Sequence, residues 1–141
     1  MLEGTVIDTV LTNAGGASPL VKNLGGSVTF LRALTYTGST TVTAGTMSLG
    51  TDLTTSPSVT VTGGKLELRV TGTPNRVIKT SSLSISGSGQ VDLQHNKLIV
   101  QGGNIGTPTA GDYDGITGWI QDGRNGGTWD GASGITSAGA T

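Results

Sequence analysis

Cysteine is absent from this chain of 141 residues, and only 12% of its residues are charged. The lack of thiols excludes disulfide cross-links and thiolate metal sites. Eight basic residues face nine acidic ones and never cluster, so the sequence offers no positive surface for nucleic acid. No apolar run approaches the length of about 18 residues that a membrane-spanning helix needs. We therefore expect no nucleic-acid partner and no membrane span.

The chain nevertheless has the composition of a folded domain. Disordered chains combine low hydrophobicity with a large net charge, whereas this chain is 33% hydrophobic and has a formal charge of -1. Its 25 glycines separate short apolar stretches rather than forming one flexible tract. The length fits a single domain with one modest core.

An internal repeat organises the first hundred residues. Each copy has a glycine turn followed by an apolar, a polar and an apolar residue. The copies are "LGGSVTFL" (Leu24–Leu31), "VTAGTMSLG" (Val42–Gly50), "VTGGKLELR" (Val61–Arg69) and "ISGSGQVDLQ" (Ile85–Gln94). Equivalent apolar residues follow one another at steps of 19, 19 and 25 residues, from Val28 to Met47, Leu66 and Val91. Short alternating runs such as "SVTVT" precede the glycines, so each copy holds at least two brief strands.

Strands this short cannot bury an apolar face alone and must stack. We predict an all-β fold, a single-stranded parallel β-solenoid of about five or six short coils. One inward ladder would contain Met47, Leu66 and Val91, and a second would contain Leu49, Leu68 and Leu93. The intervening Ser48, Glu67 and Asp92 would point outward to solvent. A β-sandwich of antiparallel hairpins is the alternative, and the equal steps favour the solenoid.

The stretch "LTYTGSTTVTAGTMSLG" (Leu34–Gly50) resembles the autotransporter-associated β-strand repeat of bacterial extracellular proteins. The matching positions are Tyr36, Gly38, Thr40, Thr41, Val42, Gly45, Met47 and Leu49. The segments "VDLQHNKLIVQGG" and "GITGWIQDGRNGGTWDGASGITS" are similar to a block that often ends such repeat arrays. Together these resemblances cover about residues 34–137. They imply a right-handed β-helix, an extracellular or cell-surface location and a role as stalk or adhesin, and they bring no catalytic residues.

The chain changes character near residue 105, which predicts a solenoid over residues 1–105 and a C-terminal cap and tail over residues 106–141. We expect a short helix in the cap, begun by Asp112 or Asp114 and stopped by Gly123. Its apolar face would cover the last coil. That face consists of Ile116, Trp119 and Ile120.

Two ligand hypotheses arise in the cap. Calcium is one, because oxygen donors are spread among the glycines at Asp112, Asp114, Asp122, Asn125 and Asp130. Their spacing matches neither an EF-hand nor the nonapeptide calcium repeat, and turn chemistry accounts for them as well. Sugar stacking on the two tryptophans is the other, against the simpler interpretation that both are buried cap residues. We predict no metal and no other cofactor.

Catalysis would require convergent carboxylates on neighbouring coils. The only candidate pair is Glu67 beside Asp92, with Lys65, Arg69 and His95 nearby. No aromatic subsites surround the pair, and "LQHNKL" is typical of a turn rather than of a catalytic base. We therefore predict no enzyme. A polysaccharide-degrading β-helix is a remote alternative.

The N-terminal run "GTVIDTVLT" (Gly4–Thr12) predicts an exposed edge strand, since it is β-branched and carries one charge, at Asp8. Edge strands are usually blunted by lysine or proline, and neither occurs before Pro19. We expect a head-to-tail homopolymer in which this run docks on the region from Trp119 to Ile135 of the next copy. The predicted interface residues are Val6, Ile7, Val10, Leu11, Trp119, Trp129 and Ile135.

This assembly predicts a structural subunit of a bacterial extracellular fibre or surface layer. The alternative is an adhesin or passenger-type module that binds a cell-surface glycan or a host surface. The two differ in where apolar and aromatic side chains are exposed: at the ends of the solenoid for a fibre, on a lateral face for an adhesin.

Overall fold

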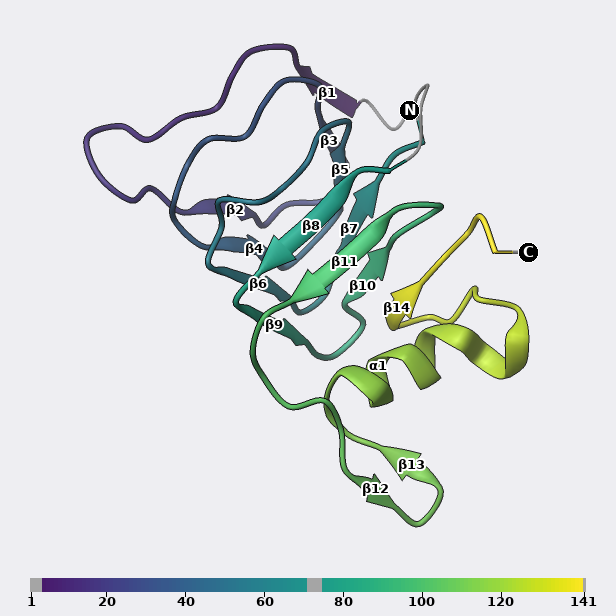
Figure 1. The fold of residues 1–141 in the computed structure, drawn as a ribbon. Coiled ribbons are helices and arrows are strands. Elements are labelled where there is room, and N and C mark those ends of the chain that lie inside the picture. Colours follow the sequence, from purple (N-terminus) through teal and green to yellow (C-terminus); the bar gives the residue numbers. More distant parts are fainter. Residues whose placement is uncertain (1–3, 71–74, 141) are drawn as a thin grey trace.

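The computed structural model describes residues 4–70 and 75–140, which wind into a β-solenoid of about five turns (Figure 1). Sheet 1 contains, in spatial order, β1 (Gly4–Ile7), β3 (Ser27–Phe30), β5 (Thr46–Leu49), β7 (Lys65–Leu68), β10 (Gln90–Asp92) and β14 (Gly134–Thr136). Sheet 2 contains β2 (Leu20–Lys22), β4 (Thr40–Val42), β6 (Ser58–Val61) and β9 (Ser82–Ile85). A third face consists of β8 (Val77–Thr80), β11 (Lys97–Val100) and the bridges Leu11–Leu34 and Leu53–Ile78.

The register confirms the predicted ladder. Met47 pairs with Val28 on one side and with Leu66 on the other, and Leu66 pairs with Val91. These pairs are all parallel, which excludes the hairpin sandwich. Met47, Leu66 and Val91 are completely buried. The ladder continues to Ile135, which pairs with Val91.

The second predicted ladder holds for its first members only. Phe30, Leu49 and Leu68 are buried and pair in register across β3, β5 and β7. Leu93 lies one residue beyond β10 and is half-buried against the core. Its backbone N–H donates to the carbonyl of Thr136 at 3.0 Å, so it still joins the last two coils.

Polar residues of the repeat fill one corner of the interior. The hydroxyl of Tyr36, which is buried, lies 2.5 Å from Thr40 Oγ1, and Thr40 donates to Ser56 Oγ at 2.8 Å. Ser56 in turn donates to the carbonyl of Gly38 at 2.9 Å. Burial raises the pKa of Tyr36 although the hydrogen bond with Thr40 opposes the shift. Tyrosine and threonine are therefore accommodated at these buried positions because each hydroxyl group has a hydrogen-bond partner.

The C-terminal segment contains β12 (Pro108–Thr109) and β13 (Asp112–Tyr113), an antiparallel hairpin, followed by α1 (Gly115–Arg124) and the short 3₁₀ helix η1 (Asn125–Gly127). The helix was predicted, but the hairpin and β14 were not. Asp114 precedes α1 without capping it, because its carboxylate accepts from the backbone N–H of Thr107. The predicted stop at Gly123 is wrong, since α1 ends at Arg124 and Asn125 takes the left-handed conformation with φ 44°.

Helix α1 covers one end of the solenoid. Ile116 and Trp119 pack against the core, whereas Ile120 is 39% exposed. A β carbon on Gly123 would lie 1.8 Å from the carbonyl oxygen of Ile135, so only glycine lets the helix approach β14 this closely. The described residues contain no helix long and apolar enough to cross a membrane.

Close stacking of the coils predicts unequal effects of alanine at two glycines. A β carbon on Gly38 would lie 2.2 Å from the carbonyl oxygen of Ser18, whereas one on Gly25 meets nothing within 4 Å. We expect Gly38→Ala to lower the free energy of unfolding by about 1–3 kcal/mol through overpacking. Gly25→Ala should change it by less than about 1 kcal/mol. Urea denaturation measures both; equal effects would contradict the close approach of the coils.

Candidate functional site

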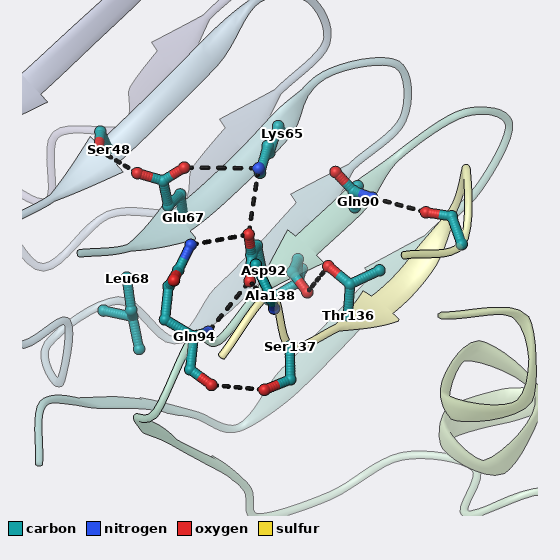
Figure 2. A network of polar contacts seen from close by, with 12 residues as sticks. Ser48, Lys65, Glu67, Leu68, Gln90, Asp92, Gln94, Thr136, Ser137 and Ala138 are labelled. Carbon is teal, nitrogen blue, oxygen red and sulfur yellow. Dashed lines mark hydrogen bonds and ion pairs between the residues drawn. The ribbon is translucent and has the colours of Figure 1, made fainter. Parts of the chain in front are cut away.

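Parallel register brings polar side chains into one row on the outer face of sheet 1. Strands β5, β7, β10 and β14 pair so that Ser48, Glu67, Asp92 and Thr136 follow one another. The stacking of Glu67 beside Asp92 is as predicted. Figure 2 shows this row with the side chains that contact it.

The expectation that the whole row faces solvent is wrong. Asp92 is 2% exposed and Ser48 is 5% exposed. The chain after β14 lies over Asp92, where the backbone N–H of Ala138 donates to Asp92 Oδ1 at 3.1 Å (Figure 2). Ser48 donates to Glu67 Oε1 at 2.9 Å. Asp92 was predicted to be exposed because the repeat gives no sign of a segment that returns more than 40 positions later.

Every oxygen of Asp92 is engaged by a donor. Oδ1 accepts from the backbone N–H groups of Gln94 and Ala138, at 3.0 and 3.1 Å. Oδ2 accepts from Gln94 Nε2 at 3.0 Å and lies 3.1 Å from Lys65 Nζ. We call Lys65, Glu67, Asp92, Gln94 and the Ala138 N–H the Asp92 network. It fastens the C-terminal segment to the last coils.

Lys65 lies between the two carboxylates, with its Nζ 3.5 Å from Glu67 Oε2. Burial by itself would lower the pKa of Lys65, but the hydrogen bond and charge of Asp92, joined by those of Glu67, outweigh it and raise the pKa. The ammonium therefore stays charged between the carboxylates. This arrangement joins β7 to β10 electrostatically, and it differs from a carboxylate pair that shares a proton.

The remaining polar candidates lie apart from this network. His95 is exposed in the turn between β10 and β11, as predicted, and its ring packs on Gly139. Arg69 follows β7 directly, and its carbonyl accepts from Arg76 Nη1. The donors to the Asp92 carboxylate are Lys65, Gln94 and Ala138, and neither His95 nor Arg69 is among them.

The proposed calcium donors are spread over a hairpin, helix α1, in which Asp122 lies, and the turn after it. Asp130 accepts from Asn125 Nδ2 at 3.0 Å and from the hydroxyl of Thr128, and these hydrogen bonds lower its pKa. Asp112 lies in the β12–β13 hairpin and Asp114 binds Thr107. In the part of the chain that the structure describes, no three His, Asp or Glu side chains gather as a metal site would require.

Apolar side chains gather at the opposite end of the solenoid. Of the ten large hydrophobic side chains that are exposed among the described residues, half lie within the first 31 positions. We call this group the N-terminal rim. It consists of Val6, Val10, Val21, Leu24 and Leu31. Val6 is 59% exposed and Leu24 is 73% exposed; Val6 pairs with Thr29, which pairs with Ser48, so Val6 begins the outer row of sheet 1 and points sideways from the first coil.

The first strand also has an open edge. Among the described residues, β1 is the end strand of sheet 1 and pairs with β3 only. The carbonyl of Ile7 accepts from Leu31, so the backbone groups of the neighbouring Val6 point away from β3. Ile7 and Leu11 turn inward and are half-buried against the core.

The C-terminal members of the predicted interface are placed differently. Ile135 is inside the solenoid and Trp119 packs against the core, while Trp129 is half-buried elsewhere. Gly134 donates to the carbonyl of Gly89, just before β10, so the backbone groups of Ile135 face α1. The helix therefore occupies the edge of β14 on which an added strand would pair.

An apolar groove at this end was not predicted from the sequence. It has a volume of about 340 Å³ and lies between α1, β11 and the last coil. Its lining is entirely aliphatic and consists of Leu93, Leu98, Val100, Ile116, Ile120 and Ile135. We call it the C-terminal groove. The alternation within "KLIV" and the helical spacing of Ile116 and Ile120 are visible in the sequence. The sequence does not show that the apolar faces of β11 and α1 meet.

Comparison of the chain with family models, curated proteins and solved structures finds no match. Its function therefore has to be inferred from the geometry described above.

The Asp92 network predicts a difference between two isosteric substitutions. The two carboxylate oxygens of Asp92 accept from four donors, and Asp92→Asn replaces one of these oxygens by an NH₂ group, which donates. The substitution also removes the main negative charge beside Lys65. We expect a loss of about 1.5–3 kcal/mol in the free energy of unfolding. Glu67→Gln, on a side chain that is 23% exposed, should cost less than about 1 kcal/mol. Denaturant titrations of both variants provide the test, and a larger effect for Glu67→Gln would refute the network.

Proposed function

We propose that this chain is a structural, non-catalytic subunit of a bacterial extracellular fibre or surface layer that assembles head to tail. The observation that carries the proposal is the N-terminal rim, where exposed apolar side chains coincide with an open strand edge. Proteins that remain monomeric usually cover or charge such edges. Strand β1, with the sequence GTVI, has neither a charge nor a proline.

The two ends of the solenoid differ in a way that favours a heterologous contact. At the N-terminal end, valine and leucine side chains project from the first coil. At the C-terminal end, the C-terminal groove is lined by aliphatic residues and partly roofed by α1. A projecting apolar surface and a recessed one at opposite ends can repeat from copy to copy without closing a ring, which generates a filament.

Helix α1 sets the nature of this contact. Because it occupies the edge of β14, strand β1 of the next copy does not simply extend sheet 1. Apolar side chains of the N-terminal rim entering the C-terminal groove would supply the contact instead, through burial of area rather than through a continuous row of backbone hydrogen bonds. The interface we propose thus keeps the N-terminal residues Val6 and Val10 and centres on Ile120 at the other end.

Charges placed in the N-terminal rim should abolish assembly. We expect the mass of the wild-type protein to increase with concentration in sedimentation velocity and light scattering. The double variant Val6→Lys/Val10→Lys should remain monomeric and folded, because two ammonium groups would have to be buried in an aliphatic groove. Ile99→Lys, on the exposed side of β11, is the matched control and should assemble as the wild type does.

A mixing experiment distinguishes head-to-tail from head-to-head contact. Ile120→Asp should disable only the C-terminal groove, so it should also be monomeric alone. Mixed with Val6→Lys/Val10→Lys, it should form one-to-one dimers and no polymer, because each variant retains one intact surface. Wild-type protein that stays monomeric at the highest concentration, or assembly of Ile120→Asp by itself, would refute the proposal.

A further inference from the structure

A second hollow lies on the lateral face of the solenoid, away from the surfaces proposed for assembly. Residues 128–130, before β14, and Ala138, after it, border a pocket of about 250 Å³ together with side chains of β7, β10 and β14. We call it the Trp129 pocket. Its walls include Lys65, Gln90, Asp92, Trp129, Asp130 and Thr136. Thr136 points to this outer face, whereas its neighbour Ile135 lines the C-terminal groove, so β14 separates the two hollows.

We propose that the Trp129 pocket binds the ring of a neutral sugar. Trp119 packs against the apolar core, but Trp129 does not belong to that cluster and remains half-buried. Trp129 lines a pocket whose other lining residues are all polar except Ala138. An aromatic face beside hydrogen-bonding side chains matches a pyranose, which has an apolar C–H face and a rim of hydroxyl groups.

The backbone at Trp129 indicates that its side chain serves a purpose other than turn formation. Its φ is 58°, in the left-handed region that glycine adopts readily and that residues with a β carbon avoid. The other positions of this loop with positive φ are Asn125, Gly126 and Gly127, and glycine and asparagine are the residues that adopt this conformation most readily. A tryptophan at a position whose backbone favours glycine is a costly choice for the fold alone, and such strain is concentrated at binding sites.

The polar walls offer both donors and acceptors, as sugar hydroxyls require. Lys65 contributes N–H donors, the carboxylate of Asp130 contributes acceptors, and the Gln90 amide contributes both, whereas the oxygens of Asp92 are already occupied by the Asp92 network. The Asp92 network holds Lys65 in place, and Gln90 Nε2 donates to the carbonyl of Gly131 at 2.7 Å (Figure 2). Side chains fixed by such contacts lose little freedom when a ligand binds.

Charge and size narrow the class of sugar. The titratable groups in the walls are one lysine and two aspartates, a formal charge of -1, and Glu67 behind Lys65 adds another negative charge. This field disfavours uronic and sialic acids relative to neutral hexoses. The volume is below the range of about 300–1,000 Å³ typical of pockets for larger ligands, so we expect one ring to be enclosed.

The test uses defined probes on the monomeric Val6→Lys/Val10→Lys background, so that its outcome is independent of assembly. The probes are the methyl glycosides of glucose, galactose, mannose and N-acetylglucosamine, with methyl glucuronide as the anionic comparison. Saturation-transfer NMR and tryptophan fluorescence report binding. We expect at least one neutral glycoside to bind with a dissociation constant on the order of 1 mM, and the glucuronide to bind more weakly.

Trp129→Gly separates binding from folding, because glycine suits the left-handed backbone. We expect this variant to weaken binding at least tenfold while its unfolding midpoint stays equal or rises. Gln90→Ala should also weaken binding, and Trp119→Phe, altered on the core side, should leave it unchanged. No binding of any probe at tens of millimolar, unchanged affinity in Trp129→Gly, stronger binding of the glucuronide, or a lower unfolding midpoint in Trp129→Gly would each overturn the proposal.

Discussion

The parallel pairing of each coil with the next is the constraint on which the rest of this protein depends. Hydrogen bonds such as Lys65 N–H to the Gly45 carbonyl, at 2.8 Å, fix the register rung by rung. That register places Met47 over Leu66 and so forms the core. At the corners the backbones come so close that Gly38 has no room for a β carbon. The same hydrogen bonds thus determine which residues are buried and where glycine is needed.

One consequence is that the solenoid has two unlike ends. In the described part of the chain the first coil pairs with the second coil on one side, and valine side chains such as Val6 remain in solvent. At the other end, α1 lies so close to β14 that Gly123 contacts the carbonyl of Ile135. An apolar end opposite a helix-covered end gives the molecule a direction, which a polymer built from identical copies would inherit.

The outer face of sheet 1 follows the same register with different side chains. Ser48, Glu67 and Asp92 lie one above the other because each follows a residue of the inward ladder, and the strands pair in one register. Lys65 then connects two of the carboxylates, and the segment after β14 is fixed to Asp92 by its backbone. Before β14, Gln90 Nε2 donates to the carbonyl of Gly131, and Trp129 lines the lateral pocket beside the polar row.

The sequence by itself determined the solenoid, its first inward ladder and part of the second, the helix near Trp119 and the open first strand, because alternation and a repeated step are local patterns. Tertiary structure decided what no local pattern encodes. The Asp92–Ala138 hydrogen bond joins positions 46 residues apart, and β14 reaches sheet 1 only after a hairpin and a helix. How the last 40 residues return to the solenoid therefore decides the burial of Asp92, the cover over β14, the C-terminal groove and the Trp129 pocket. These residues lie outside the repeat, so no periodic pattern in the sequence predicts where they pack.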